Sequence, residues 1–164
     1  MRSFLCLLLI LSLLSFLLCS CFSPTAPSNA LLQMCNAEPN LPSGKYYFYG
    51  SSPSSSGTMI DSALFCEHFG FTVLPPAMSE VESGAFYFSY RHPCEFAVLR
   101  CKSISATTAI AQILLRHIEQ LRSYWNSTEY APYVNAAEVK IFGKDVVFAV
   151  SKNPSSSFNA YKRG

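Results

Sequence analysis

Residues 94–125 read CEFAVLRCKSISATTAIAQILLRHIEQLRSYW, and residues 138–151 read EVKIFGKDVVFAVS. The first stretch predicts a strand followed by a long helix, because its apolar residues recur with the helical period of about 3.6 residues. The second stretch predicts an antiparallel hairpin, with a tight turn over residues 143–145 between two β-rich runs. Residues 146–150 are apolar at every position, which favours a strand buried on both faces. Together these elements predict a folding unit in which the apolar face of the helix packs on a sheet.

The predicted helix has two distinct faces. Arg116 and Arg122 lie on its polar face and should be exposed, and Ser103 or Ser105 can cap its first turn. A polar run begins after residue 125, so the helix should end there. The opposite arc is apolar and should be buried; its residues are Ile110, Ile113, Leu114, Ile118, Leu121, Tyr124 and Trp125.

The rest of the sequence predicts shorter elements around this unit. Strands are expected over residues 45–49, 71–74 and 85–90, and a helix over residues 59–69 with Thr58 as its cap and Gly70 as its end. Residues 153–154, Asn-Pro, indicate the start of a short C-terminal helix. A length of 164 residues suits one small domain. The order of elements predicts an α+β fold: a mainly antiparallel sheet of about four to six strands, with two main helices packed on one face.

The N-terminal residues predict an exported protein. Residues 1–20 combine a basic start with an apolar run from Phe4 to Leu18, as a signal peptide does. Residues 18–21, Leu-Cys-Ser-Cys, resemble the bacterial lipobox, and by that resemblance Cys21 carries the lipid of a lipoprotein, such as palmitate. Residues 21–40 then predict a lipid-anchored flexible stalk, and residues 41–164 a single α+β domain. Plain secretion and an uncleaved membrane anchor remain as alternatives.

Charge and cysteine content narrow the possible partners. The net charge is only +2 and no basic run is present, so nucleic acid is not an expected partner. Beyond the leader the cysteines are Cys35, Cys66, Cys94 and Cys101. The last two flank one strand and lie more than about 20 Å apart, which is too far for a disulfide. We expect the four to be buried small apolar residues, with a disulfide between other pairs as the alternative.

His117 is the most unusual residue, because it lies in the middle of the apolar arc of the long helix. We expect a buried, neutral imidazole with one hydrogen-bond partner on the sheet. The alternative is a buried base or a metal ligand, but no histidine or carboxylate that could act with it lies near in the sequence.

Two cysteine–histidine pairs offer another possible site. Residues 66–68 (Cys-Glu-His) and 92–94 (His-Pro-Cys) could in principle form a zinc site, but positions i and i+2 of a helix point in different directions. The aromatic runs KYYFY (45–49) and AFYFSY (85–90) should pack in the core, although one face could stack a ligand. We therefore expect no metal, no cofactor and no catalytic residue. The residues to test are His117, His92, Cys66 and Cys94.

Several segments together resemble a known family. They are Gly-Lys at residues 44–45, AFYFSY followed by EFAVLRC (95–101), SYWNSTEYAP (123–132) and VKIFGKDVVFAVS (139–151). With the lipobox, they resemble a family of small bacterial lipoproteins, the domain of unknown function numbered four-three-five-eight, over residues 41–162. The resemblance implies an extracytoplasmic, membrane-tethered domain and assigns no functional residue.

Function is predicted only as a class. The motifs C-x-x-C, G-x-S-x-G and H-E-x-x-H are absent from the sequence. We expect a lipid-anchored lipoprotein domain on the extracytoplasmic face of the cell membrane, acting at the cell surface as a non-enzymatic binding or assembly module. Its partner would be an extracytoplasmic protein or a small ligand. The alternative is a small extracytoplasmic enzyme, a hydrolase or thiol oxidoreductase, that uses the histidines and cysteines.

Overall fold

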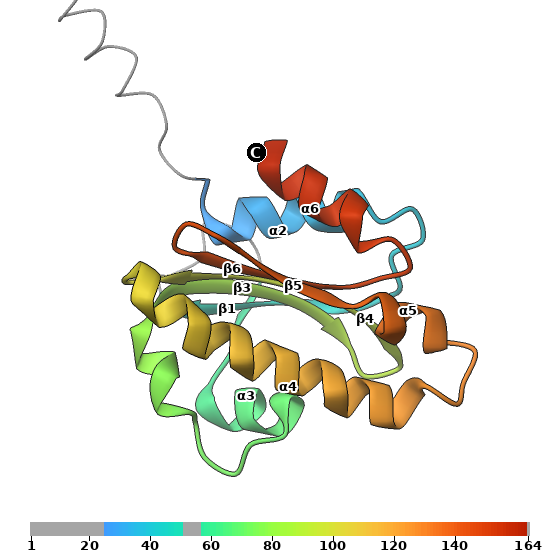
Figure 1. Cartoon of the computed structure of the whole chain (residues 1–164), viewed down its shortest axis with the longest axis horizontal. Helices are drawn as coiled ribbons and strands as arrows, with labels where there is room; N and C mark the ends of the chain where they lie inside the picture. Colours follow the sequence, from blue (N-terminus) through green and yellow to red (C-terminus); the bar gives the residue numbers. More distant parts are fainter. Residues whose placement is uncertain (1–24, 51–56, 164) are drawn as a thin grey trace, which may run out of the picture.

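The computed structural model describes residues 25–50 and 57–163, which form a six-stranded sheet with helices on both faces (Figure 1). The strand order is β2-β1-β3-β4-β6-β5. The strands are β1 (Lys45–Gly50), β2 (Thr58–Met59), β3 (Val81–Ser89), β4 (His92–Cys101), β5 (Glu138–Phe142) and β6 (Asp145–Val150). Only the short β2 pairs in parallel, with β1, and the other pairings are antiparallel. The predicted α+β class with a mainly antiparallel sheet is therefore confirmed.

The helices form two layers. On one face of the sheet lie α3 (Ser62–Phe69) and α4 (Thr107–Trp125), and on the other lie α2 (Pro27–Asn36) and α6 (Pro154–Arg163) (Figure 1). Two short 3₁₀ helices, η1 (Pro76–Glu80) and η2 (Ile104–Ala106), and the helix α5 (Ala131–Ala136) complete the fold. The expectation of helices on a single face is thus incomplete, because α2 and α6 cover the second face.

Helix α2 corrects the prediction of a flexible stalk through residue 40. Its residues Leu31 and Met34 are fully buried, and the helix packs against α6, β3 and β4. Pro27 suits the first turn, where a missing amide hydrogen costs nothing. The packed domain therefore begins at Pro27 and not at residue 41. The predicted signal peptide of residues 1–20 and the predicted lipid site Cys21 lie outside the described residues. Within the described ranges, no helix combines the length and hydropathy that a membrane span requires.

The central strands match the prediction closely. Strand β6 is buried along its whole length, and it pairs with β4 so that Ala97 faces Phe148. Successive side chains of β4 point to opposite faces of the sheet. Phe96 and Arg100 therefore point toward α2 and α6, and Glu95 and Leu99 point toward α3 and α4. This alternation places an acidic side chain under the α3–α4 layer.

Several local expectations are wrong. Residues 71–74 form no strand, and residues 58–59 form β2 and not the start of a helix. The cap of α3 is Asp61, whose side chain accepts a hydrogen bond from the Leu64 amide at 2.7 Å. Neither Ser103 nor Ser105 caps α4, because η2 precedes it.

The predicted faces of α4 are confirmed in the centre of the helix and are wrong at its C-terminal end. Leu114 and Leu121 are buried and Arg116 is exposed, as expected. Tyr124, however, is 79% exposed, and Arg122 is half-buried because its Nε donates to the Val134 carbonyl at 3.1 Å. The apolar arc is therefore only partly covered at its last turn, where Trp125 packs against the core and Tyr124 does not.

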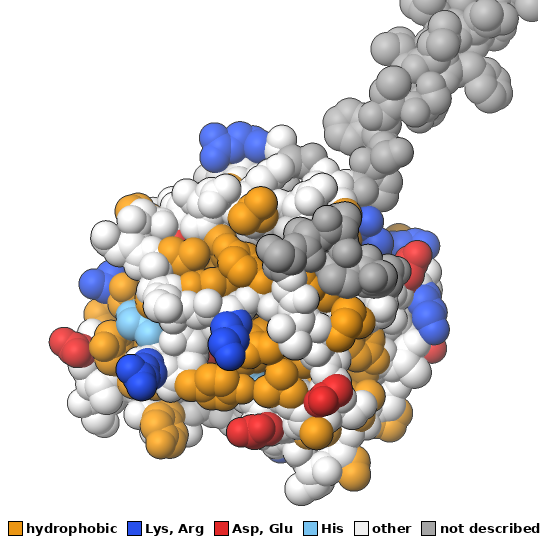
Figure 2. All heavy atoms as spheres, turned by 180° about the vertical axis from the view of Figure 1, so that it is seen from behind, with side chains coloured by type: hydrophobic (Ala, Val, Ile, Leu, Met, Phe, Trp, Pro, Cys, Tyr) orange, Lys and Arg blue, Asp and Glu red, His pale blue; other side chains and the backbone are white. Residues whose placement is uncertain are grey.

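The cysteines and strand aromatics behave as core residues. The cysteines at positions 35, 66, 94 and 101 are all unpaired and buried, as expected. Aromatic residues of β1 and β3 are buried too, among them Phe48, Phe86 and Phe88. Seen from behind, hydrophobic side chains occupy much of the middle of the surface, and charges of both signs are scattered among them (Figure 2).

Adjacent leucines on α4 test this arrangement. Leu114 is 0% exposed and Leu115 is 41% exposed, so they differ in burial but not in chemistry. We expect Leu114→Ala to lower the free energy of unfolding by about 2–5 kcal/mol, as truncations in a packed core do. Leu115→Ala should cost less than about 1 kcal/mol. Urea unfolding of both variants measures the two values, and equal losses would contradict the orientation of α4.

Candidate metal centre

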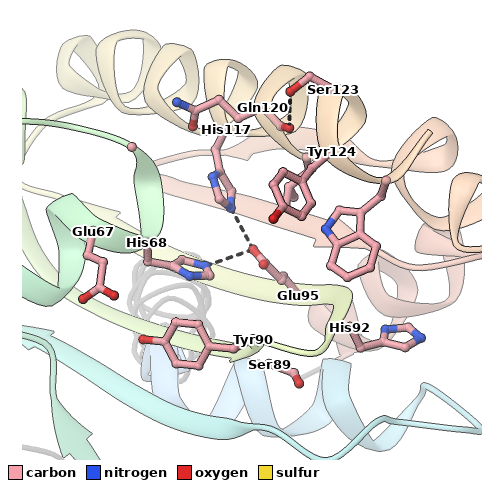
Figure 3. A pocket seen from close by; sticks show the side chains of 13 residues that line it. Glu67, His68, Ser89, Tyr90, His92, Glu95, His117, Gln120, Ser123 and Tyr124 are labelled. Carbon is pink, nitrogen blue, oxygen red and sulfur yellow. Dashed lines mark hydrogen bonds and ion pairs between the residues drawn. The ribbon is translucent and has the colours of Figure 1, made fainter. Parts of the chain in front are cut away.

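Three titratable side chains meet beneath α3 and α4. The Oε2 atom of Glu95 lies 2.9 Å from Nε2 of His117 and 3.2 Å from Nε2 of His68 (Figure 3). The side chains of Glu95, His117 and His68 are only 5%, 3% and 8% exposed. We call these three residues the His–Glu–His cluster. Each comes from a different element, because β4 carries the carboxylate while α3 and α4 carry one imidazole each.

Helix α3 positions His68 through its two ends. Asp61 fixes the first turn, and Gly70 ends the helix with a φ of 67°, a left-handed conformation that other residues rarely adopt. The His68 ring stacks on Phe88 of β3, with a distance of 3.6 Å between ring centroids. Ring stacking and the short helix together direct Nε2 toward the Glu95 carboxylate.

Helix α4 positions His117 through its apolar neighbours. His117 occupies the buried face between Ile113 and Leu121, and its ring lies 4.6 Å from that of Phe69. The rings of His117 and His68 are 5.0 Å apart. Nδ1 of His117 is buried and has no hydrogen-bond partner among the described residues. Only the Nε2 end of this ring therefore takes part in the polar interactions of the cluster.

The cluster keeps a buried carboxylate ionised. Burial alone would raise the pKa of Glu95, but charge attraction and hydrogen bonds from His68 and His117 outweigh it and lower the pKa to about 2. An ionised carboxylate in a protein interior is costly unless it is paired. The two imidazoles thus supply the only hydrogen-bond partners that the described residues offer to the Glu95 carboxylate.

The same three atoms form a set of metal ligands. One imidazole nitrogen from each histidine and one carboxylate oxygen lie within 4.8 Å of one another. Zinc–ligand bonds of about 2.0–2.2 Å place the ligand atoms of a tetrahedral site roughly 3.3–3.6 Å apart. The two oxygen–nitrogen separations of 2.9 and 3.2 Å are slightly below that spacing, and the separation between the two histidine nitrogens is within 4.8 Å. Two histidines and one glutamate also match the ligand set of some catalytic zinc sites.

The orphaned nitrogen of His117 limits the strength of such a site. A metal on Nε2 would leave the ring proton on Nδ1, which has no acceptor among the described residues. Histidine ligands are normally oriented by a second hydrogen bond, and losing one typically weakens metal affinity about 10- to 100-fold. We therefore expect this site to bind metal less tightly than sites with a complete outer shell.

The cluster opens into a cavity. Its volume is about 520 Å³, and its lining includes all three cluster residues. The rim carries Tyr90, from the turn between β3 and β4, and Tyr124 at the end of α4. A metal bound to three protein ligands would direct its remaining coordination position toward this cavity.

Of the four residues that the sequence selected for testing, only His117 belongs to the His–Glu–His cluster. His117 is buried and bonds to a residue of the sheet, as expected. His92 lines the cavity but does not join the cluster; its Nδ1 accepts a hydrogen bond from the Cys94 amide at 3.0 Å. Burial first, and then the charge of Lys152, lower the pKa of His92, against an opposing contribution from Glu129.

Neither cysteine of that set belongs to the cluster. Cys66 lies two residues before His68 on α3, so it points elsewhere, as the helical geometry predicts. Burial, followed by nearby Glu38, raises the pKa of the Cys94 thiol, and a protonated thiol is a poor nucleophile. The cysteine–histidine zinc site that the sequence analysis argued against is thus not found among the described residues. The sequence analysis did not identify Glu95 and His68 as partners of His117.

Comparison with protein families, with curated proteins and with solved structures finds no match to this chain.

The ionisation of Glu95 predicts a dependence of stability on pH. The unfolded carboxyl binds a proton near its ordinary pKa of 4.5, whereas the folded carboxyl does so only near 2. Acid therefore favours the unfolded chain: the contribution of Glu95 to stability is complete above pH 4.5 and is lost as the pH falls toward 2. We expect NMR titration of the Glu95 carboxyl carbon to show an ionised group at pH 3. A midpoint at or above 4.5 would contradict the charge pairing.

Proposed function

We propose that this domain binds a divalent transition-metal ion at the His–Glu–His cluster and presents it to a ligand in the adjacent cavity. The observation that carries the proposal is the convergence of two Nε2 atoms on one oxygen of a buried carboxylate, at 2.9 and 3.2 Å. Imidazole nitrogen with carboxylate oxygen suits Zn²⁺ and also Fe²⁺, and Zn²⁺ is the ion used in the tests below. Three protein ligands leave a fourth position free for an external group.

Binding is favoured over hydrolysis by what surrounds the cluster. A metal-dependent hydrolase needs a general base close to the metal-bound water. Among the described residues that line the cavity, Glu67 and His92 are the other candidate bases, and both side chains point away from the cluster in Figure 3. The domain is thus proposed as a non-enzymatic, metal-dependent binding module, with a small extracytoplasmic enzyme as the alternative.

Equilibrium dialysis of the purified full chain against Zn²⁺ tests the metal site. We expect about one ion per chain at pH 7, with binding lost in His68→Gln, Glu95→Gln and His117→Gln, because each change removes one of three ligands. Binding should weaken as the pH falls, since protons compete with the ion for the ligand atoms.

His92 supplies the matched control. It is the one histidine of the sequence outside the cluster and lines the same cavity, yet it does not face the cluster. His92→Gln should therefore bind Zn²⁺ as the unchanged chain does. The metal proposal fails if the unchanged chain binds no ion, or if His92→Gln loses the ion together with the three cluster variants.

We also propose that a lipid on Cys21 tethers the domain outside the membrane. Arg100 donates a hydrogen bond from Nη2 to the Thr25 carbonyl at 2.8 Å, so the domain holds its chain only four residues after Cys21. The layer of α2 and α6 adjoins this point, while α3 and α4 lie across the sheet (Figure 1). A short tether at Cys21 would thus leave the cavity facing away from the membrane.

Cys21→Ser tests the tether directly. Without an acyl acceptor, the chain should remain an unprocessed precursor or leave the membrane fraction. Membrane fractionation, with mass determination of the product, distinguishes the two results. A mature variant that stays membrane-bound would contradict lipid attachment at this residue.

A further inference from the structure

The geometry points to a monoanionic aromatic compound as the ligand of the cavity, with its oxygen donor on the metal and its ring between Tyr90 and Tyr124. This inference rests on the proposed metal site. It goes further because it names what the open coordination position and the rim of the cavity would recognise together.

Charge at the floor of the cavity favours one anionic group. A divalent ion with an ionised Glu95 and two neutral imidazoles gives a floor of net charge about +1. The described residues that line the cavity include no lysine or arginine, so among them an anion would find its compensating charge at the metal. Glu67 adds negative charge to the lining and disfavours a second anionic group. The donor should therefore be a single carboxylate, hydroxamate or phenolate oxygen group.

Aromatic side chains dominate the rim. Tyr90 is 60% exposed and Tyr124 is 79% exposed, although both are large and partly apolar. Figure 3 shows them on opposite sides of the Glu95 carboxylate, one above and one below it. Trp125 also lines the cavity, and Tyr130 packs edge-on against it at 5.3 Å. Exposed aromatic faces on two sides of an opening suit a planar ring, which would bury both.

The cavity has room for such a compound. A volume of about 520 Å³ lies within the range of small-molecule sites. The remaining polar lining includes Ser89 and Gln120, which are uncharged and can donate hydrogen bonds to neutral substituents, whereas the Ser123 hydroxyl already donates to the Gln120 carbonyl at 2.8 Å. The body of the ligand beyond its anionic donor should therefore be neutral.

Two hydroxamates that share one metal-binding group test the inference. Benzohydroxamate carries a phenyl ring and acetohydroxamate a methyl group, so their difference isolates the ring. We expect calorimetry on the Zn²⁺-loaded full chain to show benzohydroxamate binding tighter by on the order of tenfold, as one or two ring contacts produce. In the Co²⁺-loaded chain, either compound should change the visible absorption of the metal.

Exposed residues supply the variants and their control. Tyr124→Ala should weaken benzohydroxamate binding several-fold, on the order of one lost ring contact, and leave acetohydroxamate and Zn²⁺ binding unchanged. Tyr90→Ala should weaken benzohydroxamate binding by a similar factor relative to acetohydroxamate; because the Tyr90 ring packs edge-on against His68 at 6.1 Å, its Zn²⁺ affinity is measured alongside. Ile104→Ala removes a side chain that is 66% exposed and does not line the cavity, so it should change none of the three affinities.

The outcomes separate the two proposals. A chain that binds Zn²⁺ but binds both hydroxamates equally, or whose tyrosine variants behave as the unchanged chain, overturns the ligand class and leaves the metal site standing. Benzohydroxamate binding that survives in the metal-free Glu95→Gln variant also overturns it, because the donor would then not be on the metal. A chain that binds no Zn²⁺ overturns both.

Discussion

A buried carboxylate on the central strand β4 sets the condition that the α3–α4 layer must meet. Glu95 is buried, and an ionised carboxylate with so little exposure is costly unless it is paired. Its two partners come from α3 and α4, so both helices must approach the same oxygen atom for the fold to bury it. The apolar packing of His68 on Phe88 and of His117 on Phe69 makes that approach possible without leaving either ring exposed. Electrostatic pairing and core packing therefore depend on each other at this point.

The elements that the sequence predicted well are those with a long, local signal. Helix α4 is indicated by its apolar periodicity and the β5–β6 hairpin by its turn residues, and neither needs a distant partner to be identified. The helix α2 was missed because the prolines and serines around residues 23–28 suggested a linker, although Leu31 and Met34 carry an apolar pattern. Its stability comes from burial against β3, β4 and α6, which no local pattern reveals. The prediction that Tyr124 is buried was wrong for the converse reason. Its arc of α4 is apolar, but Tyr124 lies in the last turn of the helix, where it is left exposed.

The cluster was only half visible in the sequence. His117 stood out because a polar ring interrupted an apolar arc, whereas Glu95 was absorbed into an apolar strand, although an acid among apolar residues is the same kind of signal. His68 was weighed only with Cys66, its neighbour on α3. The partners of His117 lie 22 and 49 residues before it, and only the topology brings them together. Asking which strand could carry a carboxylate under the helix would have identified Glu95.

The opposite face of β4 shows why the Glu95 cluster suits a ligand better than a structural role alone. Arg100 there forms two bonds of 2.8 Å to the oxygens of Asp145, which also accepts a hydrogen bond from Tyr161 of α6. That pair needs no external ion, because arginine is permanently charged and cannot ligate a metal. The Glu95 cluster instead uses groups that exchange protons and offer lone pairs, and it lies at the floor of a cavity. Strand β4 thus carries two buried ionic groups. Only the group at Glu95 has imidazole partners, whose ring nitrogens can bind either a proton or a metal ion.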